Sequence, residues 1–293
     1  MANLKEVRLR IASVNSTQQI TKAMKMVSAA KLKRATDAIT QMRPYANKLK
    51  EILANLSASL EGSASVFATE REVKNVLVVV VTSNRGLAGA FNANAIKTAN
   101  LLIQNKYAAH RNNGTLHILA IGKKAQDFYT KNRMNVIGNH NELFNGLNFE
   151  TSTRIADVIM KGFEEGQWDR VEVIYNQFKN AAVQILTTEQ LLPLAKTESA
   201  AASKQNTDYI LEPSQAEIVE ELIPKSIKIQ LYKALLDSYA SEHGARMTSM
   251  DKATDNAGEL LKSLRLSYNQ ARQAAITNEI LEIVSGANAL SAQ

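Results

Sequence analysis

The chain of 293 residues is long enough to bury one or two hydrophobic cores. It contains no cysteine, which excludes a disulfide scaffold, a cysteine-ligated zinc site and a thiol nucleophile. Lys and Arg number 35 against 28 Asp and Glu, and the first 60 residues alone hold 11 against 3. A charge excess placed so unevenly predicts an acidic partner, which is nucleic acid, anionic lipid or an acidic protein. No apolar run approaches about 18 residues, so we expect neither a membrane span nor a removed targeting segment.

Residues 1–60 are predicted to form one long helix. Asn3 and Glu6 fit a pair of residues that cap a helix N-terminus, and Pro44 is a point where the helix can bend. Apolar side chains recur in steps of three and four from Ile39 to Leu60, which is a heptad seam. A seam of this kind needs a partner helix, so we assign residues 1–60 to an N-terminal coiled-coil helix.

Residues 70–195 read as a Rossmann-like α/β domain. Continuous β-branched runs such as VLVVVV are typical of strands that are buried on both faces of a sheet. The patterns predict strands at 76–81, 116–121 and 171–175, an edge strand at 183–186, and helices at 93–105, 123–131 and 152–165. This alternation favours a mainly parallel sheet with helices on its faces. Residues 196–212 are polar and small, and we expect a loop that links the domain to the last segment.

Residues 213–293 are predicted to form a second coiled-coil helix, from about residue 215 to a stop at Ser285 and Gly286, with Pro224 and Gly244 as points where it can kink. At about 1.5 Å per residue the two terminal helices run on the order of 85 and 105 Å, beyond the roughly 35–40 Å width of a 150-residue domain. They must therefore cover each other's seams, as an antiparallel coiled coil. The longer helix then ends in an apolar tip, AAITNEILEIVSGANAL, which we expect to lie in an apolar sleeve made by another protein.

The segment TSNRGLAGAFN follows the best strand and is the strongest candidate for a phosphate site. Gly86 and Gly89 could let backbone amides approach a phosphate, but the third glycine of the dinucleotide fingerprint and a phosphate-loop lysine are missing. A tight turn from strand to helix explains the glycines, and we favour that interpretation. His117 and His140 lack metal-binding spacing as well, so we expect no cofactor, no metal and no catalytic site.

The basic stretch MKMVSAAKLKRA, residues 24–35, has three interpretations. It is a solvated helix face, a nucleic-acid-binding arm or a membrane-surface helix. The second lacks interleaved aromatic residues and the third lacks a broad apolar face with Trp or Phe.

Three sets of motifs are specific enough to indicate a protein family. MKMVSAAKLKRA, SNRGLAGAFN, and ARMTSMDKATDNAGE with ARQAAITNEILEIVSGA together resemble the gamma subunit of F-type ATP synthases, in order and over essentially the whole chain. Asn84 and Ala90 depart from residues common in that family, which are acidic and glycine. The resemblance implies a central rotor shaft without catalytic activity, which turns with the membrane c-ring and drives the catalytic beta subunits through their conformations.

The resemblance also implies partners, a location and contact residues. The partners are the ring of alpha and beta subunits, the epsilon subunit and the c-ring, at the cytoplasmic side of a bacterial inner membrane. Contacts with the alpha and beta subunits are implied for Met24, Lys25, Lys31, Arg34, Arg246, Arg272 and Gln273. Two rival functions remain: a basic coiled-coil protein that binds nucleic acid with strong salt dependence, and a nucleotide-dependent enzyme built on residues 70–195.

Overall fold

The computed structural model describes residues 4–59, 66–194 and 215–291. Its elements are, in order, α1 (Leu4–Ser59), η1 (Val66–Ala68), β1 (Val76–Val81), α2 (Phe91–Lys106), α3 (Ala108–Asn112), β2 (Leu116–Ile121), α4 (Lys123–Lys131), η2 (Asn141–Asn145), α5 (Phe149–Glu164), β3 (Arg170–Phe178), β4 (Gln184–Leu192) and α6 (Gln215–Ser291). The predicted loop at 196–212 and the cap at Asn3 lie outside the described residues. The chain divides into two compact units, one made of residues 1–28 with 247–293 and the other of residues 29–246.

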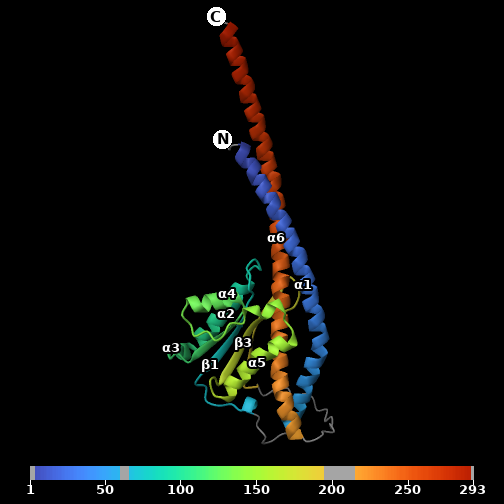
Figure 1. The fold of residues 1–293 in the computed structure, drawn as a ribbon, viewed down its shortest axis with the longest axis vertical. Coiled ribbons are helices and arrows are strands. Elements are labelled where there is room, and N and C mark those ends of the chain that lie inside the picture. The colour runs from blue at the N-terminus through green and yellow to red at the C-terminus, as the bar shows by residue number, and fades with distance from the viewer. Residues whose placement is uncertain (1–3, 60–65, 195–214, 292–293) are drawn as a thin grey trace. The chain divides into compact units, whose positions relative to one another are not determined.

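The second unit contains a four-stranded sheet with the order β2-β1-β3-β4 (Figure 1). The central strand β1 runs parallel to both of its neighbours, with Val76 opposite Leu116 on one side and opposite Arg170 on the other. The last strand, β4, is antiparallel to β3 and forms an edge. A mainly parallel sheet of this kind is what the sequence predicted, because both faces of β1 are buried and only apolar side chains occupy it.

Helices cover both faces of the sheet. On one face, side chains of α5 and of the first part of α6 pack against β1 and β3, around residues such as Ile159, Tyr175 and Leu231. On the other face, α2 and α4 pack against β1 and β2 through Ile103 and Tyr129. The result is a three-layer domain, and the carboxyl end of β1 leads directly into the turn before α2.

Within the same unit, α1 and α6 run side by side (Figure 1). Ala35 and Ile39 of α1 pack against Leu236 and Ala240 of α6, and the members of each pair are four positions apart in the sequence. This spacing places both members of a pair on one face of their helix. The pairing of the two terminal helices, which the seam predicted, is therefore present here.

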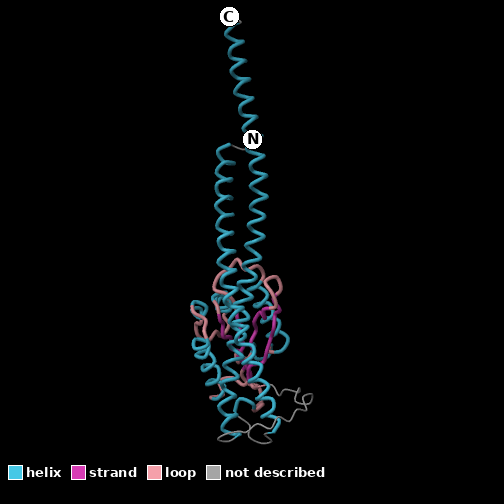
Figure 2. Tube along the Cα trace, turned by 90° about the vertical axis from the view of Figure 1, so that its right-hand side faces the viewer, coloured by secondary structure: helices cyan, strands magenta, loops and turns pink. Residues whose placement is uncertain are grey.

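The first unit is a helix pair made of the start of α1 and the last part of α6 (Figure 2). The hydroxyl groups of Thr21 and Thr254 lie 2.8 Å apart, and the side-chain amide of Gln18 donates to the carbonyl oxygen of Thr254 at 3.3 Å. Beyond the N-terminal end of α1, α6 continues alone (Figure 2).

The predicted stop of the last helix at Ser285 and Gly286 is wrong, because α6 continues to Ser291. Gly286 keeps helical geometry, and a glycine ends a helix only where its backbone turns into the left-handed region. Among the described residues, no helix combines the length and the apolar character that a membrane crossing requires.

Candidate functional site

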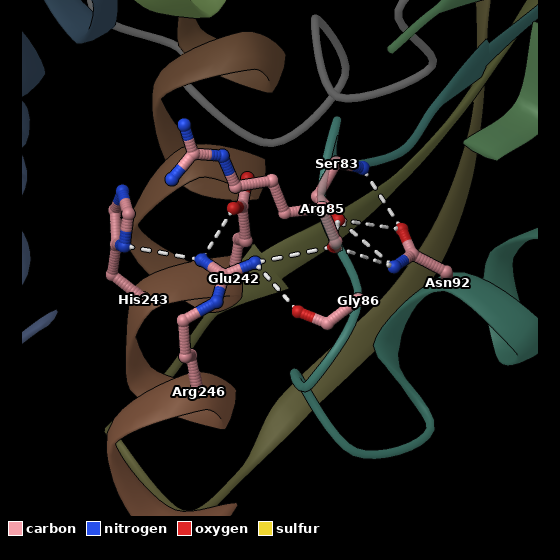
Figure 3. A network of polar contacts seen from close by, with 7 residues as sticks. All are labelled: Ser83, Arg85, Gly86, Asn92, Glu242, His243 and Arg246. Atoms are coloured by element: carbon pink, nitrogen blue, oxygen red, sulfur yellow. Dashed lines mark hydrogen bonds and ion pairs between the residues drawn. The ribbon is translucent and has the colours of Figure 1, made fainter. Parts of the chain in front are cut away.

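The turn between β1 and α2 is held by side chains of its own. The backbone N–H of Ser83 donates to Oδ1 of Asn92 at 2.8 Å, and the side-chain amide of Asn92 donates to Oγ of Ser83 at 2.8 Å. Oγ of Ser83 in turn donates to the carbonyl oxygen of Arg85 at 2.6 Å (Figure 3). Leu87 and Gly89 have positive φ, of 63° and 57°. Hydrogen bonds within the segment thus close the turn, and Gly89 occupies one of its two positions with positive φ.

Arg246 of α6 reaches this turn from the neighbouring helix. Its Nη2 donates to the carbonyl oxygens of Arg85 and Gly86, at 3.3 Å each. Its Nη1 donates to Oε1 of Glu242 at 2.5 Å and lies 3.5 Å from Nδ1 of His243 (Figure 3). Only 7% of Arg246 is exposed. Both terminal nitrogens of this guanidinium are therefore used inside the chain.

The electrostatics of this network follow from its burial. Burial, together with the charges of Arg246 and Lys31, lowers the pKa of His243 to about 3. The neutral ring can then accept a hydrogen bond from the guanidinium instead of repelling it. Burial raises the pKa of Glu242, and Arg246 opposes that rise. We read Glu242 and Arg246 as a buried ion pair whose charges compensate each other.

Lys31 and Arg34, both implied as contact residues, lie exposed on α1. Lys31 is close enough to Glu242 and His243 to lower the pKa of each, and Arg34 acts on Tyr239 in the same way. The structure therefore brings these two cations near the Arg246 network. It does not place them in an ion pair with any residue of the described ranges.

Met24 and Lys25 belong to the helix pair of the first unit. Met24 is partly buried, and Nζ of Lys25 forms an ion pair with Oδ1 of Asp251. The Lys25 and Asp251 side chains are 41% and 49% exposed, so water screens their attraction. Lys25 thus has a weak partner within the chain.

Arg272 and Gln273 are exposed on α6, at the start of its apolar tip. The tip side chains are exposed although many are large and apolar: Ile276, Ile280, Leu281, Ile283 and Val284 are each between 44% and 66% exposed. Among the α6 residues whose burial is described, the last buried one is Leu261. The part of the chain that the structure describes therefore offers no cover for the tip.

Sequence reasoning missed the roles of Glu242 and His243. One signal was available, since Glu242 and Arg246 are four residues apart, the spacing at which opposite charges meet on a helix. The partner loop could not be found this way, because it lies 161 residues from Arg246 in the sequence.

Side chains that could bind a metal ion are not clustered in the described ranges. Residues 4–59, 66–194 and 215–291 contain no group of three or more His, Asp or Glu side chains placed to hold a metal ion. His117 of β2 bonds the side-chain amide of Asn135 at 2.8 Å. A groove of about 580 Å³ lies between α2 and α4, and its charged lining residues are Lys97 and Lys124.

Comparison with known proteins gives consistent results along the whole chain. The family model described as ATP synthase matches residues 3–290. The ATP synthase gamma chain of Cytophaga hutchinsonii is 58% identical over 99% of this chain and its own full length. That of Flavobacterium johnsoniae is 59% identical, with the same coverage.

Solved structures agree in fold. One is the central stalk and c-ring of the Tetrahymena thermophila mitochondrial ATP synthase, with a TM-score of 0.59 and 26% identity, covering 80% of this chain and 99% of the matched chain. Another is the Euglena gracilis mitochondrial ATP synthase in rotational state 3, with a TM-score of 0.67 and 22% identity, covering 99% and 95%. Identity above half along the full length, together with this likeness in fold, shows that the chain belongs to the ATP synthase gamma chain family.

Proposed function

We propose that this chain is the central rotor shaft of an F-type ATP synthase. It couples rotation of the c-ring, driven by ion flow, to the conformational cycle of the catalytic beta subunits, and performs no catalysis itself. The observation that carries this function is membership of the gamma chain family along the whole length. The nucleic-acid-binding and nucleotide-enzyme alternatives gain no support from the comparisons.

The two units suit different parts of this task. The helix pair and the exposed tip of α6 enter the ring of alpha and beta subunits, where an apolar sleeve covers the tip and gives little angular preference. The α/β domain, with the boundaries 70–195, meets the epsilon subunit and the c-ring. Residues 1–60 and 213–293 are the shaft segments, and residues 196–212 link them to the domain.

The contact residues in the ring are Met24, Lys25, Lys31, Arg34, Arg246, Arg272 and Gln273. Exposed ion pairs are worth about 0–1 kcal/mol each, so cations on this surface can form and break contacts with acidic groups as the shaft turns. Torque then comes mainly from the bulk and curvature of the helices. The complex sits at the cytoplasmic side of the bacterial inner membrane, and this chain is attached there through the c-ring.

A tagged pull-down from native membranes tests this function, with subunit stoichiometry and ATPase activity measured on the same sample. We expect one copy of this chain with several copies of two large ATPase subunits, and a change in turnover when the chain is removed. Recovery of the chain alone, or with nucleic acid, would overturn the proposal.

A further inference from the structure

Residues 240–246 of α6 are all buried, although most of their side chains are polar or charged. We call them the polar segment. Its polar members, each at most 7% exposed, are Ser241, Glu242, His243 and Arg246. A helix that is enclosed on every side is ordinarily apolar, because each buried polar group costs free energy unless it is hydrogen-bonded. Buried ion pairs are often less stabilising than apolar side chains of similar volume, so the polar segment serves something other than stability alone.

Two parts of the α/β domain contact the polar segment through its most buried face. Oγ of Ser241 donates to the carbonyl oxygen of Asn176, in β3, at 3.0 Å. One helical turn further on, Ala245 packs against Ala88 and Phe91, which stand in the turn before α2 and at the first position of α2. The end of β3 and the turn between β1 and α2 therefore both touch α6 here.

Gly244 brings a third part of the domain against the helix. A Cβ atom at Gly244 would lie 3.1 Å from Cα and 3.2 Å from the carbonyl oxygen of Ala181, in the turn between β3 and β4. Such contacts are tighter than ordinary van der Waals contact, so an alanine would push this turn away from α6. A glycine inside a helix costs stability relative to alanine, and the close approach of the two backbones gives the reason for it.

Arg246 completes the contacts by holding the turn between β1 and α2. Its guanidinium donates to the carbonyl oxygens of Arg85 and Gly86, and it is oriented by the Glu242 carboxylate and the His243 ring (Figure 3). Arginine suits this place because its planar fork donates in several directions at once. A partner carboxylate could bind the guanidinium only by displacing these acceptors, which would leave buried polar groups unpaired.

Together these contacts surround α6. Successive residues of an α-helix point about 100° apart, so positions 241, 244, 245 and 246 cover about 200° of its circumference. On the remaining side, Ala240 packs against α1. Apolar packing is non-directional, whereas a hydrogen bond weakens steeply when its angle changes. A rotation of α6 about its own axis would therefore break the polar contacts with the domain, in addition to the clash that Gly244 avoids.

We propose that the polar segment is a rotational lock: it fixes the angle of α6 about its own axis against the α/β domain, so that a twist applied to the domain passes to the helix without slip. This inference rests on the proposed function, because a twist reaches the domain only if the chain is a shaft. It gives Arg246 an internal role, where the resemblance implies a contact with a partner.

Single-molecule rotation of the complex with the alpha and beta subunits tests the lock. The chain has no cysteine, so Lys131→Cys on α4, at an exposed position, attaches a probe to the domain at one site only. The readout is the angular spread of the probe while the complex waits for ATP. Arg246→Gln, Ser241→Ala and Gly244→Ala should each widen this spread. The matched control is Arg154→Gln, which removes an exposed arginine that pairs with Glu150 at the same spacing of four residues, and should leave the spread unchanged.

The three variants separate a lock from a contact with the ring. Ser241 is fully buried and Gly244 is buried, so neither can touch a ring subunit. A wider spread in all three variants supports the lock. A wider spread in Arg246→Gln alone would show that Arg246 acts through a partner, and an unchanged spread in all three would show that the polar segment holds no angle. Either result would overturn the proposal.

Hydrogen exchange of the free chain gives an independent readout. The amides of residues 84–90 should exchange about tenfold faster in Arg246→Gln, as expected for the loss of a hydrogen bond to a charged group. Unchanged exchange there would mean that Arg246 does not hold the turn, against the proposal. Urea denaturation identifies any variant that does not fold, and Ser241→Ala, which removes a single hydroxyl group, keeps the rotation test decisive in that case.

The design also distinguishes failure of the lock from failure of the proposed function. If the wild-type chain rotates in the ring and the variants match its angular spread, only the lock is wrong. If the wild-type chain neither assembles with the ring nor rotates, the shaft function fails and the lock fails with it.

Discussion

The sheet of the second unit and the helix pair of the first unit are held together in contrasting ways. All six residues of β1 are fully buried, and apolar side chains from helices on both faces enclose them. The helix pair buries far fewer large apolar side chains. Its two helices, α1 and α6, are connected by hydrogen bonds and an ion pair that are partly open to water. Close-packed interiors resist changes of volume, whereas exposed polar contacts can exchange with water at little cost.

This difference teaches where the molecule tolerates change. Close packing on both faces of β1 makes the sheet domain resist displacement of its side chains. The helix pair can adjust locally, since its polar contacts contribute little individually. A shaft that meets different ring subunits in turn would benefit from such adjustment close to the contact surface and from rigidity in the domain.

The largest effect is expected for Leu119→Ala in β2. Leu119 is fully buried within the sheet core, and removal of its side chain should lower the free energy of unfolding by about 2–5 kcal/mol. The control is Leu9→Ala on α1, where the leucine is 63% exposed and the expected change is within about 0.5 kcal/mol. Urea denaturation monitored by far-UV circular dichroism measures both, and similar losses would contradict the contrast between the units.

The second prediction concerns a buried charge beside the sheet. Asp237 of α6 is 2% exposed, and burial raises its pKa from 3.8 to about 6, against the opposing charges of Lys233 and Arg43. A folded-state pKa above the unfolded value stabilises the protein at low pH, and this stability is lost as the pH rises through about 6. Asp237→Asn should therefore raise the free energy of unfolding at pH 8 by roughly 3 kcal/mol at most, with little change at pH 4.

Thermal unfolding at the two pH values checks this expectation. Asp127→Asn, which alters an exposed carboxylate on α4, serves as the control and should change little at either pH. A gain for Asp237→Asn that is equal at pH 4 and pH 8 would mean that ionisation of Asp237 is not the cause.

A smaller effect is expected for the threonine contact of the helix pair. Thr21→Val removes the hydroxyl that lies 2.8 Å from the Thr254 hydroxyl, at a cost of about 0.5–1.5 kcal/mol. Thr254 keeps its bond to the carbonyl oxygen of Met250, so no buried donor is orphaned. The double variant Thr21→Val with Thr254→Val should recover part of the loss, because two apolar groups of similar shape then meet. Additive losses in a double-mutant cycle would argue that the two hydroxyls do not interact.

The smallest effect is expected for Lys25→Ala. The ion pair with Asp251 is about half exposed, so its loss should lower the free energy of unfolding by about 0–1 kcal/mol and by less at high salt. Denaturation at 0.05 M and 1 M salt measures the difference. A large loss that persists at high salt would show that this contact is stronger than an exposed ion pair.

Local sequence patterns predicted the positions of those strands that are buried along all or nearly all of their length. The runs at 76–81 and 116–121 coincide with β1 and β2, because continuous β-branched and aliphatic runs seldom suit any other element between two helical layers. The last strand was predicted only at 183–186, whereas β4 extends over Gln184–Leu192. Its middle, TTEQ, is polar because an edge strand is partly exposed, and a polar run carries a weaker strand signal.

The candidate site was less accessible from the sequence. Periodicity placed Arg246 on a helix, but it cannot show that a turn from far earlier in the chain supplies two carbonyl acceptors. Every residue has a backbone carbonyl group, so no sequence pattern indicates which carbonyls accept hydrogen bonds from Arg246. The positive φ of Leu87 is equally hidden, because leucine is not a residue that signals such a conformation.

The contacts of the first unit join residues from opposite ends of the chain, and this has a consequence during synthesis on the ribosome. Lys25 and Asp251 are separated by 226 positions. At about 5–20 residues per second, the early part of α1 waits on the order of 10–45 s before its partner has been made. All four strands of the sheet are complete by Leu192, well before that point. During this interval Val7, Thr21 and Ser28 of α1, which are buried in the complete chain, lack the last part of α6 as a packing partner.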